Sequence, residues 1–111
     1  MALATATARN TLANAYAGAA KFAALYTSVP SSTPGTEVTG GSYARVPITW
    51  SNAVAGSVTA TVTLNVSSGV TVRGAGVHTA ETAGYFDGWT VAEQPFGSDG
   101  KYTLTLTYTA V

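Results

Sequence analysis

The sequence predicts a mainly β fold, an antiparallel β-sandwich of the Ig-like or jelly-roll-like kind, with one short N-terminal α-helix. Two segments, SVTATVTLNV and KYTLTLTYTA, alternate strictly between apolar and polar residues, which is typical of half-buried antiparallel strands. Turn-forming residues separate several further short apolar segments, as in sandwiches and open barrels. With 111 residues, the chain has the length of a single domain, and we expect one over residues 1–111.

Residues 1–20 are expected to form an N-terminal arm and a helix. Alanine, the best helix former, dominates this segment, and its apolar residues recur at helical spacing, so we predict a helix near residues 8–19. Gly18 should weaken that helix by about 1 kcal/mol relative to alanine. The next segment, KFAALYTSV, alternates as an extended chain would, which favours a strand near residues 21–28 over a continuation of the helix.

Residues 28–42 form a predicted loop that is rich in Pro, Gly, Ser and Thr and has no hydrophobic period. Loops of this length inside a compact domain are usually functional, as binding loops or as assembly contacts. Gly40 and Gly41 are predicted to make the turn that ends the loop.

The following segment, YARVPITW, is predicted to be a strand that anchors Val46, Ile48 and Trp50 in the core. Pro47 cannot donate a hydrogen bond to a strand ladder, so it places this strand at a sheet edge or at a bulge. We predict that Arg45, on the opposite face, pairs with Glu37 or with a neighbouring subunit. Further along, VTVRGAGVHTA and GYFDGWTVA flank the turn-like ETAG and predict a hairpin.

Charged residues make up only 9% of the chain, against about 25% in ordinary domains, and the formal net charge is zero. The basic residues are dispersed, so no nucleic-acid partner is predicted. No apolar stretch is long enough to span a membrane, and no segment resembles a secretory signal, so we expect a product made in the cytoplasm. A surface with so few charges suggests packing against other subunits.

The sequence offers no recognisable catalytic or metal-binding constellation, and we predict a non-enzymatic protein without a cofactor or metal. A zinc site needs three or four ligands, whereas the chain has one histidine, His78, and no cysteine. We predict His78 to be a surface or interface residue. The Gly74-Ala75-Gly76 stretch lacks the further features of a dinucleotide-binding loop and is predicted to mark a close backbone approach or a bulge.

The aromatic residues support two interpretations. Trp50, Tyr85 and Trp89, with Phe86 and Phe96, could form a sugar-stacking platform, which would make the chain a carbohydrate-binding module. We favour the alternative, in which these side chains pack in the core and against the hairpin.

Several stretches together resemble a family of small virion proteins from tailed phages of actinobacteria and their relatives. The most specific stretch is EVTGGSYARVPITW; it follows an Ala/Asn helix, an aromatic-Thr-Ser strand end at residues 25–28 and a Pro/Gly-rich loop. GVHTAETAGYFDGW and FGSDGKYTLTLTYTA extend the resemblance over almost the whole chain. Tyr26 occupies a position where a histidine is expected to be common, which argues against a catalytic or ligand-binding role there.

Members of that family are labelled minor tail, tail-fibre or head-decoration proteins, so the resemblance implies a β-sandwich that assembles into the virion. Our leading interpretation is a capsid decoration (minor capsid) protein that contacts the major capsid protein and copies of itself, as a trimer or another symmetric cluster. The runner-up is a tail-associated protein that contacts tail proteins. The helix and residues 28–42 are the expected contact elements, with Arg9, Glu37, Arg45 and Pro47 as the candidate assembly contacts.

Overall fold

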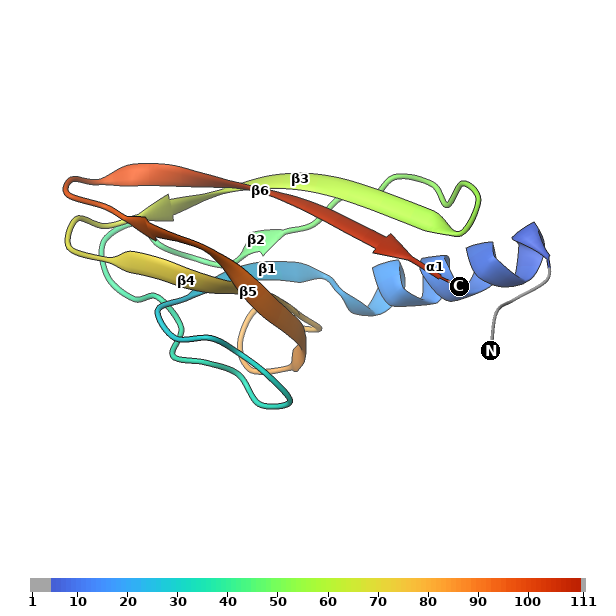
Figure 1. Ribbon diagram of the computed structural model, residues 1–111, viewed down its shortest axis with the longest axis horizontal. Coiled ribbons are helices and arrows are strands. Elements are labelled where there is room, and N and C mark those ends of the chain that lie inside the picture. The colour runs from blue at the N-terminus through green and yellow to red at the C-terminus, as the bar shows by residue number, and fades with distance from the viewer. Residues whose placement is uncertain (1–4, 111) are drawn as a thin grey trace.

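The computed structural model describes residues 5–110, and within them one helix and six strands form two layers (Figure 1). One antiparallel sheet has the strand order β2-β1-β4-β5, and the second consists of β3 and β6. Apolar side chains of both sheets form the core between them, so the predicted sandwich is confirmed. The elements are α1 (Ala6–Ala19), β1 (Phe22–Tyr26), β2 (Val46–Pro47), β3 (Ser57–Val66), β4 (Thr71–His78), β5 (Tyr85–Pro95) and β6 (Gly100–Thr109).

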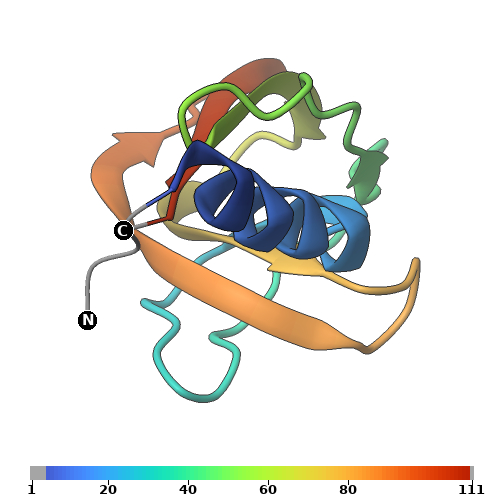
Figure 2. The ribbon, with the colours of Figure 1, turned by 90° about the vertical axis from the view of Figure 1, so that its right-hand side faces the viewer.

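The predicted helix is present and begins two residues earlier than expected. It begins after Thr5, whose Oγ1 accepts a hydrogen bond from the Ala8 N–H at 3.1 Å and so caps one of the unpaired donors of the first turn. The chain then enters β1, which confirms the predicted strand. α1 lies end to end with the four-stranded sheet, and the long β3–β6 ribbon extends over both (Figures 1 and 2).

The β3–β6 ribbon pairs without a bulge from Ser57 opposite Thr109 to Val66 opposite Gly100. Its inner face carries buried Val and Leu side chains, and its outer face carries a double row of threonines. The alternation read from the two Thr-rich segments is therefore confirmed over the full length of both strands.

The four-stranded sheet is covered on its outer face by part of the 28–42 segment. Pro30 is buried against Gly74 and Gly88, where a Cβ atom would come within 2.4 and 2.9 Å of Pro30 atoms. Gly76 in the same way leaves room for the ring of Tyr26. The predicted close approach at Gly74-Ala75-Gly76 is confirmed, and a register shift between β4 and β5 adjoins it, between Val72 and Gly74.

The β4–β5 hairpin is confirmed, but the prediction for its histidine is wrong. His78 is only 2% exposed, because β4 is an inner strand between β1 and β5 and its last residue is closed in by the hairpin loop. The small residues before it in GAGVH alternate too weakly in hydrophobicity to reveal which face they occupy.

The strand predicted in YARVPITW is much shorter than expected. Only Val46 and Pro47 pair with β1, at the outer edge of the sheet, so the edge position read from Pro47 is confirmed. Val46, Ile48 and Trp50 are half-buried and pack against the core from its margin.

Candidate functional site

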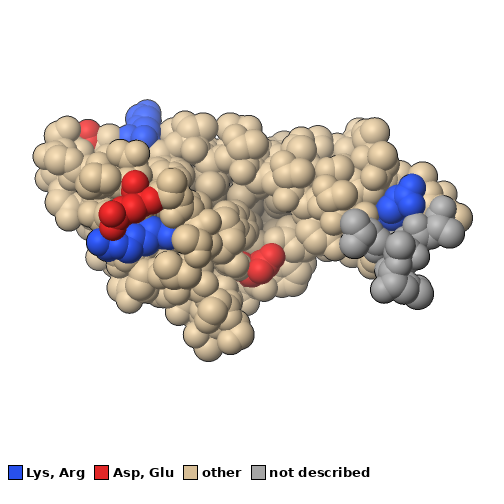
Figure 3. Space-filling model, in the orientation of Figure 1, with Lys and Arg blue, Asp and Glu red and all other residues tan. Residues whose placement is uncertain are grey.

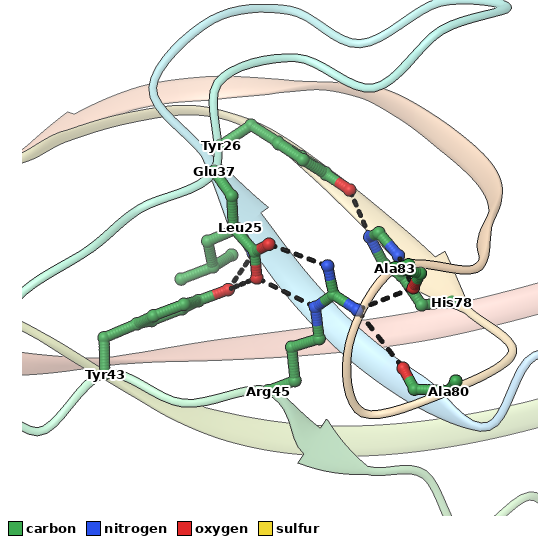
Figure 4. A network of polar contacts seen from close by, with 8 residues as sticks. All are labelled: Leu25, Tyr26, Glu37, Tyr43, Arg45, His78, Ala80 and Ala83. Atoms are coloured by element: carbon green, nitrogen blue, oxygen red, sulfur yellow. Dashed lines mark hydrogen bonds and ion pairs between the residues drawn. The ribbon is translucent and has the colours of Figure 1, made fainter.

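A bidentate ion pair joins Glu37 and Arg45 beside the end of β1 (Figure 4). The Arg45 Nε donates to one carboxylate oxygen of Glu37 at 3.0 Å, and NH2 donates to the other at 2.8 Å. The Arg45 side chain is 11% exposed and that of Glu37 26% exposed, so the pair is largely withdrawn from solvent. The predicted partnership of these two residues is confirmed within one chain.

Neighbouring backbone contacts position Glu37 for this pair. Glu37 forms an isolated β-bridge with Tyr26, and the next residue, Val38, is buried and donates its N–H to the carbonyl of Leu25 at 3.0 Å. These two residues divide the predicted 28–42 loop into two parts. The first part is a projecting lobe closed by a hydrogen bond from Thr27 N–H to the Thr36 carbonyl, and the second is a turn at Gly40 and Gly41.

Tyr43 and the β4–β5 loop complete the network around the ion pair. The Tyr43 hydroxyl donates to Glu37 at 2.7 Å and accepts from the Leu25 N–H at 3.1 Å. On its other side, Arg45 NH1 donates to the carbonyls of Ala83 at 2.8 Å and Ala80 at 3.2 Å. One guanidinium therefore holds the 37–45 segment and the 79–84 loop together.

His78 links the same loop to β1. Its Nδ1 donates to the Ala83 carbonyl at 3.0 Å, because a carbonyl can only accept, and in the neutral ring Nε2 then accepts from the Tyr26 hydroxyl. Burial, together with the nearby Arg45 charge, lowers the pKa of His78 and favours this neutral form.

Charge within the network is fixed by these contacts. Burial by itself raises the pKa of the Glu37 carboxyl, but the hydrogen bonds from Arg45 and Tyr43 and the Arg45 charge outweigh it and hold that pKa below its ordinary value. Burial and the Glu37 charge raise the pKa of Tyr26 to about 12. Each polar side chain thus keeps one protonation state near neutral pH, as expected of a structural network.

A second cluster joins α1 to both sheets. Tyr16 stacks on Tyr108 of β6 with ring centroids 4.1 Å apart, meets the edge of Trp50, and donates from its hydroxyl to Asp87 of β5 at 2.9 Å. Burial and the Asp87 hydrogen bond raise the pKa of Tyr16. Beside these rings lies an open cavity of about 370 Å³, also lined by Trp89 and by residues 105–107 of β6.

The arrangement of both clusters is that of a scaffold, and comparison with known proteins agrees. A family model described as Podophage GP4 fiber I protein gp80 matches residues 2–106. The chain belongs to this family. No curated protein and no solved structure matches it. Membership in the Gp80 family makes the chain a phage virion structural protein.

Of the four predicted contact residues, this Gp80-family chain brings together only Glu37 and Arg45. Pro47 is exposed on β2. Arg9 lies on α1 at the other end of the molecule, against Gly56, where an added Cβ would meet the Arg9 Cβ at 2.7 Å.

The sequence did not indicate the role of Tyr16 or Tyr108. Both fit the helical and strand patterns as ordinary apolar positions, and only the pairing of α1 with β6 brings their rings together. Trp50 and Trp89 line the cavity beside them, whereas Tyr85 packs against Tyr26 and His78 elsewhere. The packing interpretation is confirmed for Trp50, Trp89 and Phe96, which pack against the core, whereas Phe86 is 42% exposed.

Among residues 5–110, no helix of the Gp80-family chain is both long and apolar enough to cross a lipid bilayer. The same residues contain no group of three or more metal-ligating side chains.

Proposed function

We propose that this chain is a non-enzymatic structural subunit of a phage fibre, and that it is held in the particle by contacts of its loops and its helix with neighbouring proteins. The observation that carries the proposal is the match of residues 2–106 to a family described as a fiber protein. The polar network supports it, because both oxygens of Glu37 and three nitrogens of Arg45 are already engaged in holding loops.

The projecting lobe, residues 27–36, is the proposed contact element of the sheet end. It stands out from the sheet in Figure 1, and at its base Pro30 and the hydrogen bond from Tyr85 to the Ser31 carbonyl fix it against β4 and β5. Val29 in this lobe is 54% exposed. Because the base of the lobe is already held in place, a contact made by Val29 would order few further residues and would lose little conformational entropy.

Two exposed valines provide a matched test of the lobe. Val29→Asp is expected to reduce the number of copies incorporated per purified virion, measured by quantitative immunoblotting. Val54→Asp places the same charge on a valine that is 71% exposed beside β3, and it is expected to leave incorporation unchanged. Equal incorporation of Val29→Asp and the unmutated protein would show that the lobe makes no contact.

Capsid decoration, our leading interpretation from the sequence, is the second candidate. The outer face of the β3–β6 ribbon favours it, because a row of uncharged threonines suits packing across a capsid lattice as well as contact along a fibre. Cryo-electron microscopy of the virion separates the two functions: density for this chain in a fibre supports the first, and density over the head lattice supports the second. The actinobacterial host range implied by the resemblance stays a prediction.

A further inference from the structure

Each of the two sheets ends in two edge strands, and three of these four edges are protected, over part or all of their length, against pairing with another chain. β2 is two residues long and contains Pro47. β5 has two register shifts against β4 and carries Asp87, Glu93 and Pro95. Short length, proline, bulges and charges are the usual means by which proteins block edge-to-edge association.

The edge of β3 is covered at its start by the preceding segment of the chain. Ser51 donates its N–H to the Thr59 carbonyl at 2.8 Å, and its Oγ accepts from the Thr59 N–H at 3.0 Å. Val54 and Ser57 form a further bridge. The outward backbone groups near the start of β3 therefore already have partners.

The edge of β6 has none of these protections beyond Lys101 near its start. Within residues 5–110, β6 pairs with β3 alone, without a bulge, and its residues 102–109 include neither proline nor a charge. In Figure 3 the upper middle of the molecule shows no charged side chain, and one acidic side chain lies below it. An uncharged, regular edge of this length is a template for another strand.

The pattern of backbone hydrogen bonds between β3 and β6 shows which N–H and C=O groups of β6 point toward its open edge. Ala110 donates its N–H to the Gly56 carbonyl at 2.8 Å, so Ala110 points its backbone toward β3, and by the antiparallel pattern every second residue along β6 does the same. Thr103, Thr105 and Thr107 fall on the alternate positions. Their backbone N–H and C=O groups therefore point away from β3, toward the open edge.

The sequence of β6 favours a second copy of the same strand as the partner of this edge. Residues 102–108 read YTLTLTY, a palindrome centred on Thr105. If two copies of β6 run antiparallel with Thr105 opposite Thr105, every cross-strand pair joins like with like: threonine with threonine, leucine with leucine, tyrosine with tyrosine. Thr103, Thr105 and Thr107 of one copy then lie opposite Thr107, Thr105 and Thr103 of the other. Because the backbone N–H and C=O groups of these residues point toward the partner strand, each opposed pair can form two backbone hydrogen bonds.

We infer that β6 is a self-association edge, through which two copies of this chain pair antiparallel about a two-fold axis at Thr105 and join their β3–β6 ribbons into one four-stranded sheet. The outer threonine rows of the two ribbons then form one continuous face. Threonine pairs of this kind already occur inside the ribbon, between Thr63 and Thr103, whose Oγ1 atoms lie 3.3 Å apart. The open cavity described above borders residues 105–108 of this strand.

Analytical ultracentrifugation over a range of concentrations tests this inference on the full chain. The unmutated protein is expected to dimerise reversibly. Thr105→Lys puts like charges directly opposite each other at the axis and should weaken dimerisation about fivefold or more. Thr61→Lys is the matched control, because Thr61 is the neighbour of Thr105 on β3 and shares its outer face but lies away from the axis; it should dimerise as the unmutated protein does.

A charge-swap mixture makes the assignment specific. Thr105→Lys and Thr105→Glu variants should each dimerise weakly alone and recover dimerisation when mixed. In hydrogen-exchange NMR, the amides of Thr103, Thr105 and Thr107 should be protected at high concentration and exposed on dilution. A protein that stays monomeric at all concentrations, or a Thr105→Lys variant that dimerises normally, would overturn the inference. Neither result bears on whether the chain is found in fibres, which the particle reconstruction decides.

Discussion

Gly76 lies on β4 under the ring of Tyr26, and its lack of a side chain is what lets that ring pack there. A Cβ atom at this position would lie 2.7 Å from Tyr26 Cε2 and 2.9 Å from the backbone oxygen of Asp87 on the paired strand. Since the backbone of a central strand pair cannot easily move, Gly76→Ala should lower the free energy of unfolding by about 1–3 kcal/mol, as measured by urea denaturation.

Gly18 provides the contrasting substitution. It lies within α1, and a Cβ atom added there would have no neighbouring atom within 4 Å, so Gly18→Ala should raise the free energy of unfolding by up to about 1 kcal/mol through helix propensity alone. Equal effects of the two substitutions would contradict the packing of Tyr26 on β4.

Arg45 is predicted to be the most important polar residue for stability. Arg45→Ala removes two of the three hydrogen bonds to the Glu37 carboxylate, together with its counter-charge, and also the donor to the Ala80 carbonyl, in a largely buried site, and should cost about 2–3 kcal/mol in urea denaturation. A double-mutant cycle with Glu37→Ala should show a coupling energy of about 1–3 kcal/mol. Arg73→Ala is the control, because its pair with Glu93 is exposed and should contribute less than about 1 kcal/mol.

At the scale of elements, Tyr16 makes the largest aromatic contact that attaches α1 to the sheets. A helix of 14 residues is marginal by itself in water, so its stability must come from docking against the sheets. Tyr16 contributes to that docking through its stack on Tyr108 and its bond to Asp87, beside the buried Ala13 and the hydrogen bond from the Gly56 N–H to Asn10. Tyr16→Ala should therefore cost about 2–3 kcal/mol.

Hydrogen exchange can test this attachment element by element. In Tyr16→Ala the amides of α1 should exchange faster, while those of β3 and β6 keep their protection. Tyr16→Phe retains the ring stack and should lose only the smaller contribution of the hydrogen bond, about 1 kcal/mol. Leu12→Ala, at a helix residue that is 47% exposed, should change little. Slow exchange of α1 in Tyr16→Ala would show that other contacts hold the helix.

At the scale of the whole molecule, His78 and Glu37 set how stability depends on pH between neutral and acidic conditions. The pKa of His78 is lowered on folding, so above about pH 6.5 both states are neutral there, and below that pH the unfolded chain binds a proton that the folded chain does not. The free energy of unfolding should consequently fall as the pH drops from about 7 to 5. His78 is the single histidine of the chain, so His78→Gln should flatten this part of the curve.

Glu37 affects the free energy of unfolding at lower pH than His78 does. Its folded pKa is below the ordinary value of 4.5, so its contribution to stability is present above that pH and is lost as the pH falls through the lowered folded value. Glu37→Gln should remove this second, acidic decline and leave the decline caused by His78. A single decline common to both variants would show that the two groups do not titrate as the structure indicates.

The sequence predicted where the helix and strands lie better than it predicted which of them pack against each other. Strict alternation identified β3 and β6, and Pro47 identified an edge, because these signals are local. The burial of His78 and the contact of Tyr16 with Tyr108 depend on which strands lie beside each other and on a loop that folds back over β4, and no local period contains that information. The Glu37–Arg45 pair was predictable because both residues flank the same turn.

The arrangement of α1 beneath the far half of the β3–β6 ribbon has a practical consequence for labelling. The start of α1 and the end of β6 both lie at one pole of the long axis, and the turns after β3 and β5 lie at the other (Figure 1). A fluorescent reporter or affinity tag joined at either terminus would therefore mark the same pole. In an image of the virion, such a tag would reveal the direction in which each copy points, in addition to where it is located.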